Sequence, residues 1–165
     1  MPKRYETPLK RSPKSDPQQY RVYRMELEAI GARQYLILTR PKIRRLLRTL
    51  GTLYHVPRVK VVFNGMTQWA AEWEEPNIIR IGAKQTSQDL LTALHEFAHH
   101  LHHYVAPQAQ QQPHGPQFMC CYMSVLDTVR FLPISAMRAV CEDYEVKYIA
   151  PKSHDGVSQL ARRIT

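Results

Sequence analysis

One segment, TSQDLLTALHEFAHHLHHYV at residues 86–105, constrains the fold more than any other part of the chain. Its apolar residues recur every three or four positions, which is the period of an α-helix with one buried side. Thr86 is followed three residues later by Asp89, a spacing typical of a capping box at a helix start. The segment therefore predicts an amphipathic helix that forms one wall of the core. Its apolar arc consists of Leu90, Leu91, Leu94, Phe97, Ala98, Leu101, Tyr104 and Val105.

The same helix carries an HExxH pattern, formed by His95, Glu96 and His99. Residues four apart on an α-helix lie about 40° from each other around the axis, so both imidazoles can reach one metal ion. Imidazole nitrogens bind zinc at about 2.0–2.1 Å, and catalytic zinc sites keep one position open for water. Glu96 lies about 100° around the axis from His95, where it can take a proton from that water but cannot easily bind the ion. The pattern predicts a Zn²⁺ site with His95 and His99 as ligands and Glu96 as general base.

A third ligand is expected downstream, because catalytic zinc sites usually have three protein ligands. His114 opens the segment HGPQF, in which Gly115 permits close backbone approach and Pro116 suits the first turn of a helix. A histidine at a helix entrance is held in place, so His114 is the predicted third ligand. The alternative is a glutamate of the last helix, Glu142 or Glu145.

Three further histidines follow the pattern on the same helix. His100 is expected to face solvent, opposite the apolar arc. His102 and His103 flank the proposed site and are interpreted as ordinary polar residues. His99 and His103 share the spacing of four, but no glutamate follows His99, so this second pair is the weaker candidate.

Three short segments upstream of the helix are predicted to be strands, at 57–64, 66–73 and 77–83. The first, PRVKVVFN, has alternating apolar residues, and turn-like residues separate the second from the third. Such short links favour an antiparallel meander. Further helices are predicted at 39–51, from residue 116, and at 134–148. The expected fold class is α+β, with a small antiparallel sheet packed against the HExxH helix and the other helices.

The predicted organisation is one folded domain at residues 20–150, which is long enough for a single hydrophobic core. Residues 1–19 combine four prolines with five basic residues and are predicted to form a disordered basic arm. Residues 151–165 are predicted to be a C-terminal tail. The first residues lack the apolar core of a secretion signal, and no apolar run is long enough to cross a membrane. An intracellular location, cytoplasmic or nuclear in a eukaryote, is expected, with no membrane partner.

Basic residues are concentrated in the first third of the chain. Residues 1–60 hold 15 Lys and Arg against 4 Asp and Glu, whereas residues 61–165 hold 8 against 10. This asymmetry favours binding to a polyanion such as DNA, and the predicted helix at 39–51 supplies the candidate residues Lys42, Arg44, Arg45 and Arg48. The alternative is a solvated basic segment that only increases solubility.

The two histidine motifs together resemble the SprT-like metalloprotease family, which includes the Spartan proteases that act on DNA–protein crosslinks. LLTALHEFAHHL followed by HGPQF matches the family's active-site helix and the histidine that opens its next helix, and the resemblance covers about residues 40–130. It implies a zinc protease with ligands His95, His99 and His114, with Glu96 as base, and with Gly115 and Phe118 as structural partners. Many relatives also carry a four-cysteine zinc ribbon. This chain has three cysteines and no CxxC pair, so it lacks that ribbon.

Two functional hypotheses follow. The first is a zinc endopeptidase that cuts a protein substrate, with DNA-associated proteins as a candidate class, and with the edge of the 77–83 strand pairing with the extended substrate. The second is a nucleic-acid-binding protein whose zinc site is structural or degenerate. Glu96 favours the enzyme, because a purely structural site has no use for a base. A histidine-rich core helix without metal would leave HGPQF unexplained. Trp69 and Trp73, in the 66–73 strand, are predicted to pack on the sheet.

Overall fold

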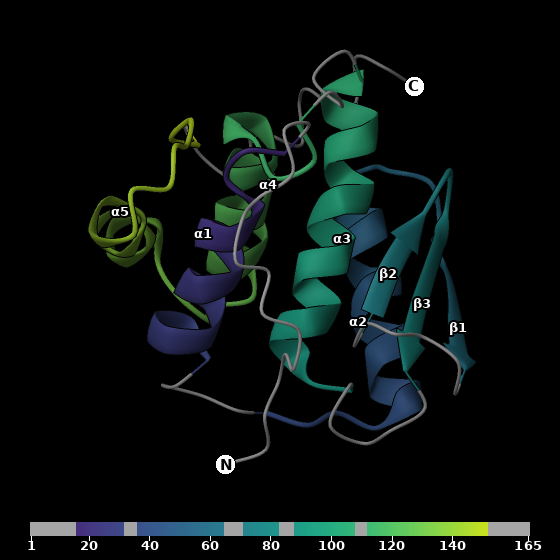
Figure 1. Cartoon of the computed structure of the whole chain (residues 1–165). Helices are drawn as coiled ribbons and strands as arrows, with labels where there is room; N and C mark the ends of the chain where they lie inside the picture. Colours follow the sequence, from purple (N-terminus) through teal and green to yellow (C-terminus); the bar gives the residue numbers. More distant parts are fainter. Residues whose placement is uncertain (1–15, 32–35, 65–70, 83–87, 108–111, 152–165) are drawn as a thin grey trace.

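The computed structural model describes residues 16–31, 36–64, 71–82, 88–107 and 112–151 (Figure 1). The α+β class is confirmed: the described residues form helices and a small three-stranded sheet, which lies at one side of the molecule. In chain order the elements are α1 (Gln19–Met25), the π-helix η1 (Glu26–Ile30), α2 (Arg40–Leu53), β1 (Lys60–Asn64), β2 (Ala71–Glu74), β3 (Ile78–Gly82), α3 (Leu90–Val105), α4 (Pro116–Thr128) and α5 (Ile134–Asp143).

The sheet is mixed, so the predicted antiparallel meander is wrong. The strand order is β1-β3-β2, with β1 parallel to β3 and β2 antiparallel to β3. Successive strands still alternate in direction along the chain, so β1 and β3 run the same way. Because β3 lies between β1 and β2, it pairs with β1, and that pair is parallel. Ile79 and Ile81 of β3 are fully buried, whereas β2 carries the exposed Glu72 and Glu74. β3 takes the central position, where both of its edges are paired and Ile79 and Ile81 are buried on one face.

The central position of β3 contradicts the expectation that the 77–83 strand has a free edge for a substrate. Both edges of the 77–83 strand are already paired, to β1 on one side and to β2 on the other. That strand cannot add another by edge pairing. The sheet has its two edges at β1 and β2, and β2 is the edge nearer to α3 (Figure 1).

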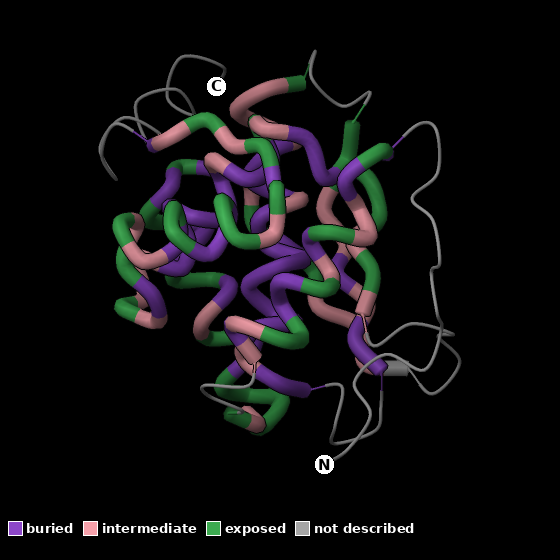
Figure 2. The backbone as a smooth tube through the Cα atoms, turned by 60° about the vertical axis from the view of Figure 1, so that its left-hand side comes forward, coloured by how far each residue is buried: buried purple, intermediate pink, exposed green. Residues whose placement is uncertain are grey.

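Helix α3 runs through the middle of the molecule between the sheet and α4 (Figure 1). Its N-cap is Asp89, whose side chain accepts hydrogen bonds from the Thr92 backbone N–H at 3.0 Å and from the Thr92 hydroxyl at 2.5 Å. Thr86, the predicted cap, lies outside the described residues. Figure 2 shows that the buried backbone is concentrated in the centre of the molecule. None of the helices in the described ranges is long and apolar enough to cross a membrane.

His100 is buried, which contradicts the predicted solvent-facing position. The segment before β1 covers the side of α3 that carries His100. The Nε2 atom of His100 donates a hydrogen bond to the Pro57 carbonyl at 2.8 Å. The helix is therefore enclosed on more than its apolar arc, and this polar residue is accommodated by a main-chain acceptor.

The other boundaries shift by a few residues. Helix α2 continues through Gly51 to Leu53, because Gly51 is buried inside the helix and does not end it. Helix α5 ends at Asp143, short of the predicted residue 148. The predicted arm extends too far, because Asp16 and Gln18 are buried and belong to the folded domain. Residues 1–15, the tail at 152–165 and Trp69 lie outside the described residues.

Candidate metal centre

Three histidines converge beside a cleft along α3: His95 and His114 are buried, and His99 is half-buried. His95 and His99 come from one face of α3, and His114 precedes the first turn of α4. The Nε2 atom of His95 lies 3.1 Å from that of His99 and 3.1 Å from that of His114. Two nitrogens bound tetrahedrally to one zinc would be about 3.3 Å apart, given Zn–N distances of about 2.0–2.1 Å. The three predicted ligands are therefore brought together, in a group close enough to bind a metal ion.

Two buried carboxylates fix the tautomers of these rings. Nδ1 of His95 donates to Glu26 Oε1 at 2.6 Å, and Nδ1 of His114 donates to Asp16 Oδ2 at 2.5 Å. With the proton on Nδ1, each neutral ring presents a bare lone pair at Nε2. Lone pairs that face each other at 3.1 Å repel unless a metal ion or a proton lies between them. Carboxylate-to-histidine pairs of this kind accompany metal-bound histidines in proteins, so the donor set fits a zinc ion.

The segment that supplies the carboxylates is tied to the ligand loop. Asp16 also accepts from the His114 backbone N–H at 3.3 Å, and Gln18 donates to the His114 carbonyl. The Gln18 amide then exchanges two hydrogen bonds with the Lys147 main chain, at 3.0 and 2.9 Å. Glu26 begins the π-helix directly after α1. The first described segment of the chain thus contacts the histidines at two points: Asp16 binds His114 and Glu26 binds His95.

Replacement of either carboxylate should weaken metal binding without removing a candidate ligand. We expect Glu26→Gln and Asp16→Asn each to lower zinc affinity about 10- to 100-fold, because the imidazole loses its acceptor and its fixed orientation. Competition with a chromogenic chelator measures this. Glu28→Gln, on the same π-helix but exposed and paired with Arg24, is the matched control and should keep wild-type affinity. Equal affinities in all three variants would contradict the role given to the carboxylates.

The electrostatics of the centre favour a cation near His95. Burial alone would raise the pKa of Glu26, but the charge and hydrogen bond of His95 lower it overall, so Glu26 is a carboxylate. Burial would lower the pKa of His95, and Glu26 outweighs it and raises that pKa. Burial, together with the neighbouring histidines, lowers the pKa of His99. Burial also lowers the pKa of His114, although Asp16 opposes this. The last two rings are therefore neutral at pH 7, with lone pairs available to a metal.

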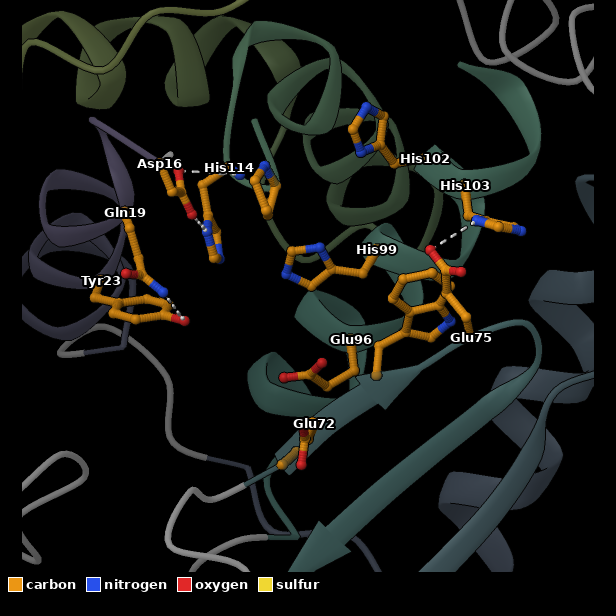
Figure 3. Close-up of a pocket in the computed structure, with 13 residues that line it drawn as sticks. Asp16, Gln19, Tyr23, Glu72, Glu75, Glu96, His99, His102, His103 and His114 are labelled. Atoms are coloured by element: carbon orange, nitrogen blue, oxygen red, sulfur yellow. Dashed lines mark hydrogen bonds and ion pairs between the residues drawn. The ribbon is translucent and has the colours of Figure 1, made fainter. Parts of the chain in front are cut away.

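Glu96 lies next to the three histidines but outside the ligand group. It lines a cleft of about 500 Å³ together with His99, Tyr23 and Trp73 (Figure 3). Its side chain is largely buried, and burial raises its pKa to about 7, assisted by the nearby Glu26 and opposed by His95. A carboxylate with a raised pKa is a stronger base than an exposed one, and a pKa near the working pH suits proton transfer.

The walls of the cleft come from α1, β2 and α3. The Trp73 ring of β2 stacks on the His99 ring, with centroids 6.4 Å apart and an angle of 17° between the planes. Trp73 is half-buried against the core, as predicted for a packing residue, and its ring also contacts a candidate metal ligand. The Tyr23 ring of α1 lies edge-on to His114, with centroids 5.1 Å apart. Burial raises the pKa of Tyr23, so its phenol keeps its proton at neutral pH.

The alternative ligands do not reach the centre. Glu142 is exposed and accepts a hydrogen bond from Tyr148, and Glu145 is exposed and pairs with Arg21 at 3.6 Å. His103 lies 3.8 Å from Glu75 and is not part of the group. Among the described residues, His114 is therefore the third member of the cluster.

Three residues of the site were not predicted from the sequence: Asp16, Tyr23 and Glu26. Asp16 falls in the segment interpreted as a disordered arm, and the other two fall in a stretch with no clear periodicity. One signal in the sequence could have indicated Asp16 and Glu26: residues 1–60 are strongly basic and contain only 4 acidic residues. Two of them, Asp16 and Glu26, are buried at the histidines.

The candidate nucleic-acid residues lie apart from this centre. Lys42, Arg44, Arg45 and Arg48 are all exposed on α2, and none of them lines the cleft. The site geometry neither requires nor excludes a role for them.

Comparison of the chain with known protein families, characterised proteins and solved structures finds no match.

Proposed function

We propose that the protein is a zinc-dependent endopeptidase of the SprT-like type, in which Glu96 is the general base. The observation that carries the proposal is a buried carboxylate beside three convergent histidine nitrogens, at the wall of a cleft. A structural zinc site would be closed by a fourth protein ligand and would not need this base. The resemblance of the HExxH and HGPQF segments to SprT-like proteases supports the same reaction.

In this proposal His95, His99 and His114 hold the zinc. When bound, zinc would supply a Lewis acid that polarises the substrate carbonyl and makes water more acidic. Glu96 accepts the proton of the attacking water and then delivers it to the leaving nitrogen. Its raised pKa supports both transfers, because the group can give up the proton that it has taken.

The substrate would lie along β2. This strand is at the edge of the sheet, and its residues Ala71, Glu72 and Trp73 line the cleft. An extended peptide can add to such an edge through main-chain hydrogen bonds, which brings its backbone beside Glu96 and His99. The proposed substrates are therefore polypeptides that can adopt an extended conformation, with proteins associated with DNA as the candidate class.

Tyr23 is the proposed donor to the carbonyl oxygen on which negative charge develops. It lines the same cleft as Glu96, and its phenol stays protonated. We expect Tyr23→Phe to lower kcat about 100-fold and to leave zinc content unchanged, as for removal of one donor to such an oxygen. Steady-state kinetics on a quenched-fluorescence peptide measure the loss. Tyr20→Phe, on the same helix but outside the lining of the cleft, is the control. A Tyr23→Phe variant with wild-type kcat would remove this role.

The test of the proposed function is cleavage of an unstructured polypeptide by the zinc-loaded protein, followed by mass spectrometry of the fragments. Cleavage should stop with a chelator and return when zinc is added. A zinc-loaded protein that leaves the polypeptide intact over many hours would contradict the proposal.

A further inference from the structure

A second hollow, of about 310 Å³, lies between α2 and the outer strand β1. Its lining consists of Arg44 and Arg48 from α2, and of Arg58, Val59, Lys60 and Val61 from the chain that enters β1. Four of these six residues carry a positive charge, and none is acidic. We call this hollow the basic groove.

The basic side chains are arranged in a row along α2. Arg40, Arg44 and Arg48 follow one another at intervals of four residues, so they share one side of the helix and advance about 6 Å at each step. The guanidinium groups of Arg40 and Arg44 lie over the Phe63 ring, at 5.2 and 5.0 Å from its centroid. Phe63 packs against the core and so gives these long side chains a fixed support.

The charges of the groove are not neutralised within the described part of the chain. Arg44, Arg48, Arg58 and Lys60 are exposed, and the ion pairs found among the described residues involve other side chains, such as Arg21, Arg24 and Arg80. Cations held close together without carboxylates repel one another. Such a cluster is stabilised by an external polyanion, which also releases bound counterions when it docks.

The cleft at the metal centre has the opposite character. Its lining includes Asp16, Glu72, Glu75 and Glu96, and no Lys or Arg occurs among the described residues that line it. A polyanion would therefore be repelled from the cleft. The groove adjoins β1 and the cleft adjoins β2, which are the two opposite edges of the sheet (Figure 1).

We propose that the basic groove binds the phosphodiester backbone of a nucleic acid and does not read its bases. The lining offers cations and two valines but no Asn, Gln, Asp or Glu, the side chains that pair with base edges alongside Arg and Lys. The nucleic acid is thereby held at one sheet edge, while a polypeptide reaches the other. This inference goes beyond the proposed peptidase activity and does not depend on it.

The experiment uses the full chain and fluorescently labelled duplex DNA of 20 base pairs, with binding followed by anisotropy at several salt concentrations. Arg44→Gln with Arg48→Gln removes two charges from the groove. Lys42→Gln with Arg45→Gln removes two charges from the same helix, but neither residue lines the groove, so this double variant is the matched control. All four positions are exposed, and circular dichroism checks that both variants keep the fold.

For the groove variant we expect the slope of log affinity against log salt to become shallower by about 2, and the affinity at 0.1 M salt to fall roughly 10- to 100-fold. The control should change the slope by less than about half as much. Two duplexes of unrelated sequence should bind equally, and RNA of the same length shows whether the backbone alone is sufficient. Equal losses in both variants, no DNA binding by the wild type, or displacement of DNA by polyglutamate at an equal concentration of charge would overturn the proposal. DNA binding and cleavage are separate readouts, so this inference and the proposed function can fail independently.

Discussion

Glu96→Gln is expected to lower the rate of peptide cleavage at least about 1,000-fold while the protein keeps its zinc. Glutamine has the shape of glutamate but cannot accept a proton, and removal of a general base costs about 10²- to 10⁴-fold. Zinc should remain because Glu96 is not part of the group that could hold the ion, which consists of His95, His99 and His114. The measurement is kcat/KM on a quenched-fluorescence peptide, together with zinc content by elemental mass spectrometry on the same samples.

Glu142→Gln is the matched control for this variant. The residue is exposed, accepts a hydrogen bond from Tyr148, and does not line the cleft. Its replacement should leave both the rate and the zinc content at wild-type values. A Glu96→Gln protein that still cleaves within about tenfold of the wild type would exclude Glu96 as the base. Loss of both zinc and activity would instead make Glu96 part of the metal site.

The half of the site that lies on α3 was predictable because its geometry is local. Once residues 90–105 form a helix, the positions of His95 and His99 relative to each other are fixed by the helix itself, and so is the offset of Glu96. The amphipathic pattern was strong enough to predict the helix. His114 was predictable only through a motif, since nothing in its local geometry places it 3.1 Å from a residue 19 positions earlier.

The carboxylates that orient the ligands could not be predicted, because they depend on contacts between distant parts of the chain. Asp16 meets a histidine 98 residues away, and Glu26 meets one 69 residues away. The polar and proline-rich composition around Asp16 indicates a segment that cannot form a core by itself. Asp16 and Gln18 are nevertheless buried, because His114 and the Lys147 main chain are their hydrogen-bonding partners.

The sheet order was mispredicted for a similar reason. Short links between successive strands favour a meander. Strand order also depends on which strand is suited to have a neighbouring strand along both of its edges. β3, with Ile79 and Ile81 fully buried, is suited to the centre, whereas β2, with two exposed glutamates, is suited to an edge. His100 was assigned to solvent because the periodicity of one helix contains no information about the segment at Pro57 that covers it.

His114→Ala is expected to reduce zinc content from about one ion per chain to a small fraction after extensive dialysis. Removal of one of three ligands should lower the affinity by more than about 100-fold, which exceeds the effect of losing a hydrogen-bonding partner of a ligand. Zinc that binds only the folded protein also stabilises it, by about 2.7 kcal/mol when free zinc is 100 times its Kd. The rise in Tm that zinc produces in the wild type should therefore be absent in the variant. Elemental mass spectrometry and thermal unfolding of untagged protein measure both effects.

His103→Ala is the control, because this histidine lies on the same helix and lines the same cleft but does not belong to the ligand group. It should retain about one zinc and the full rise in Tm. Loss of zinc in both variants would mean that the cluster binds metal through more histidines than the three that converge. About one zinc in both would move the third ligand away from His114, and the carboxylate of Asp16 would then orient a ring that holds no metal. A wild-type chain without zinc would exclude the metal centre and with it the peptidase, whereas the basic groove between α2 and β1 would be unaffected.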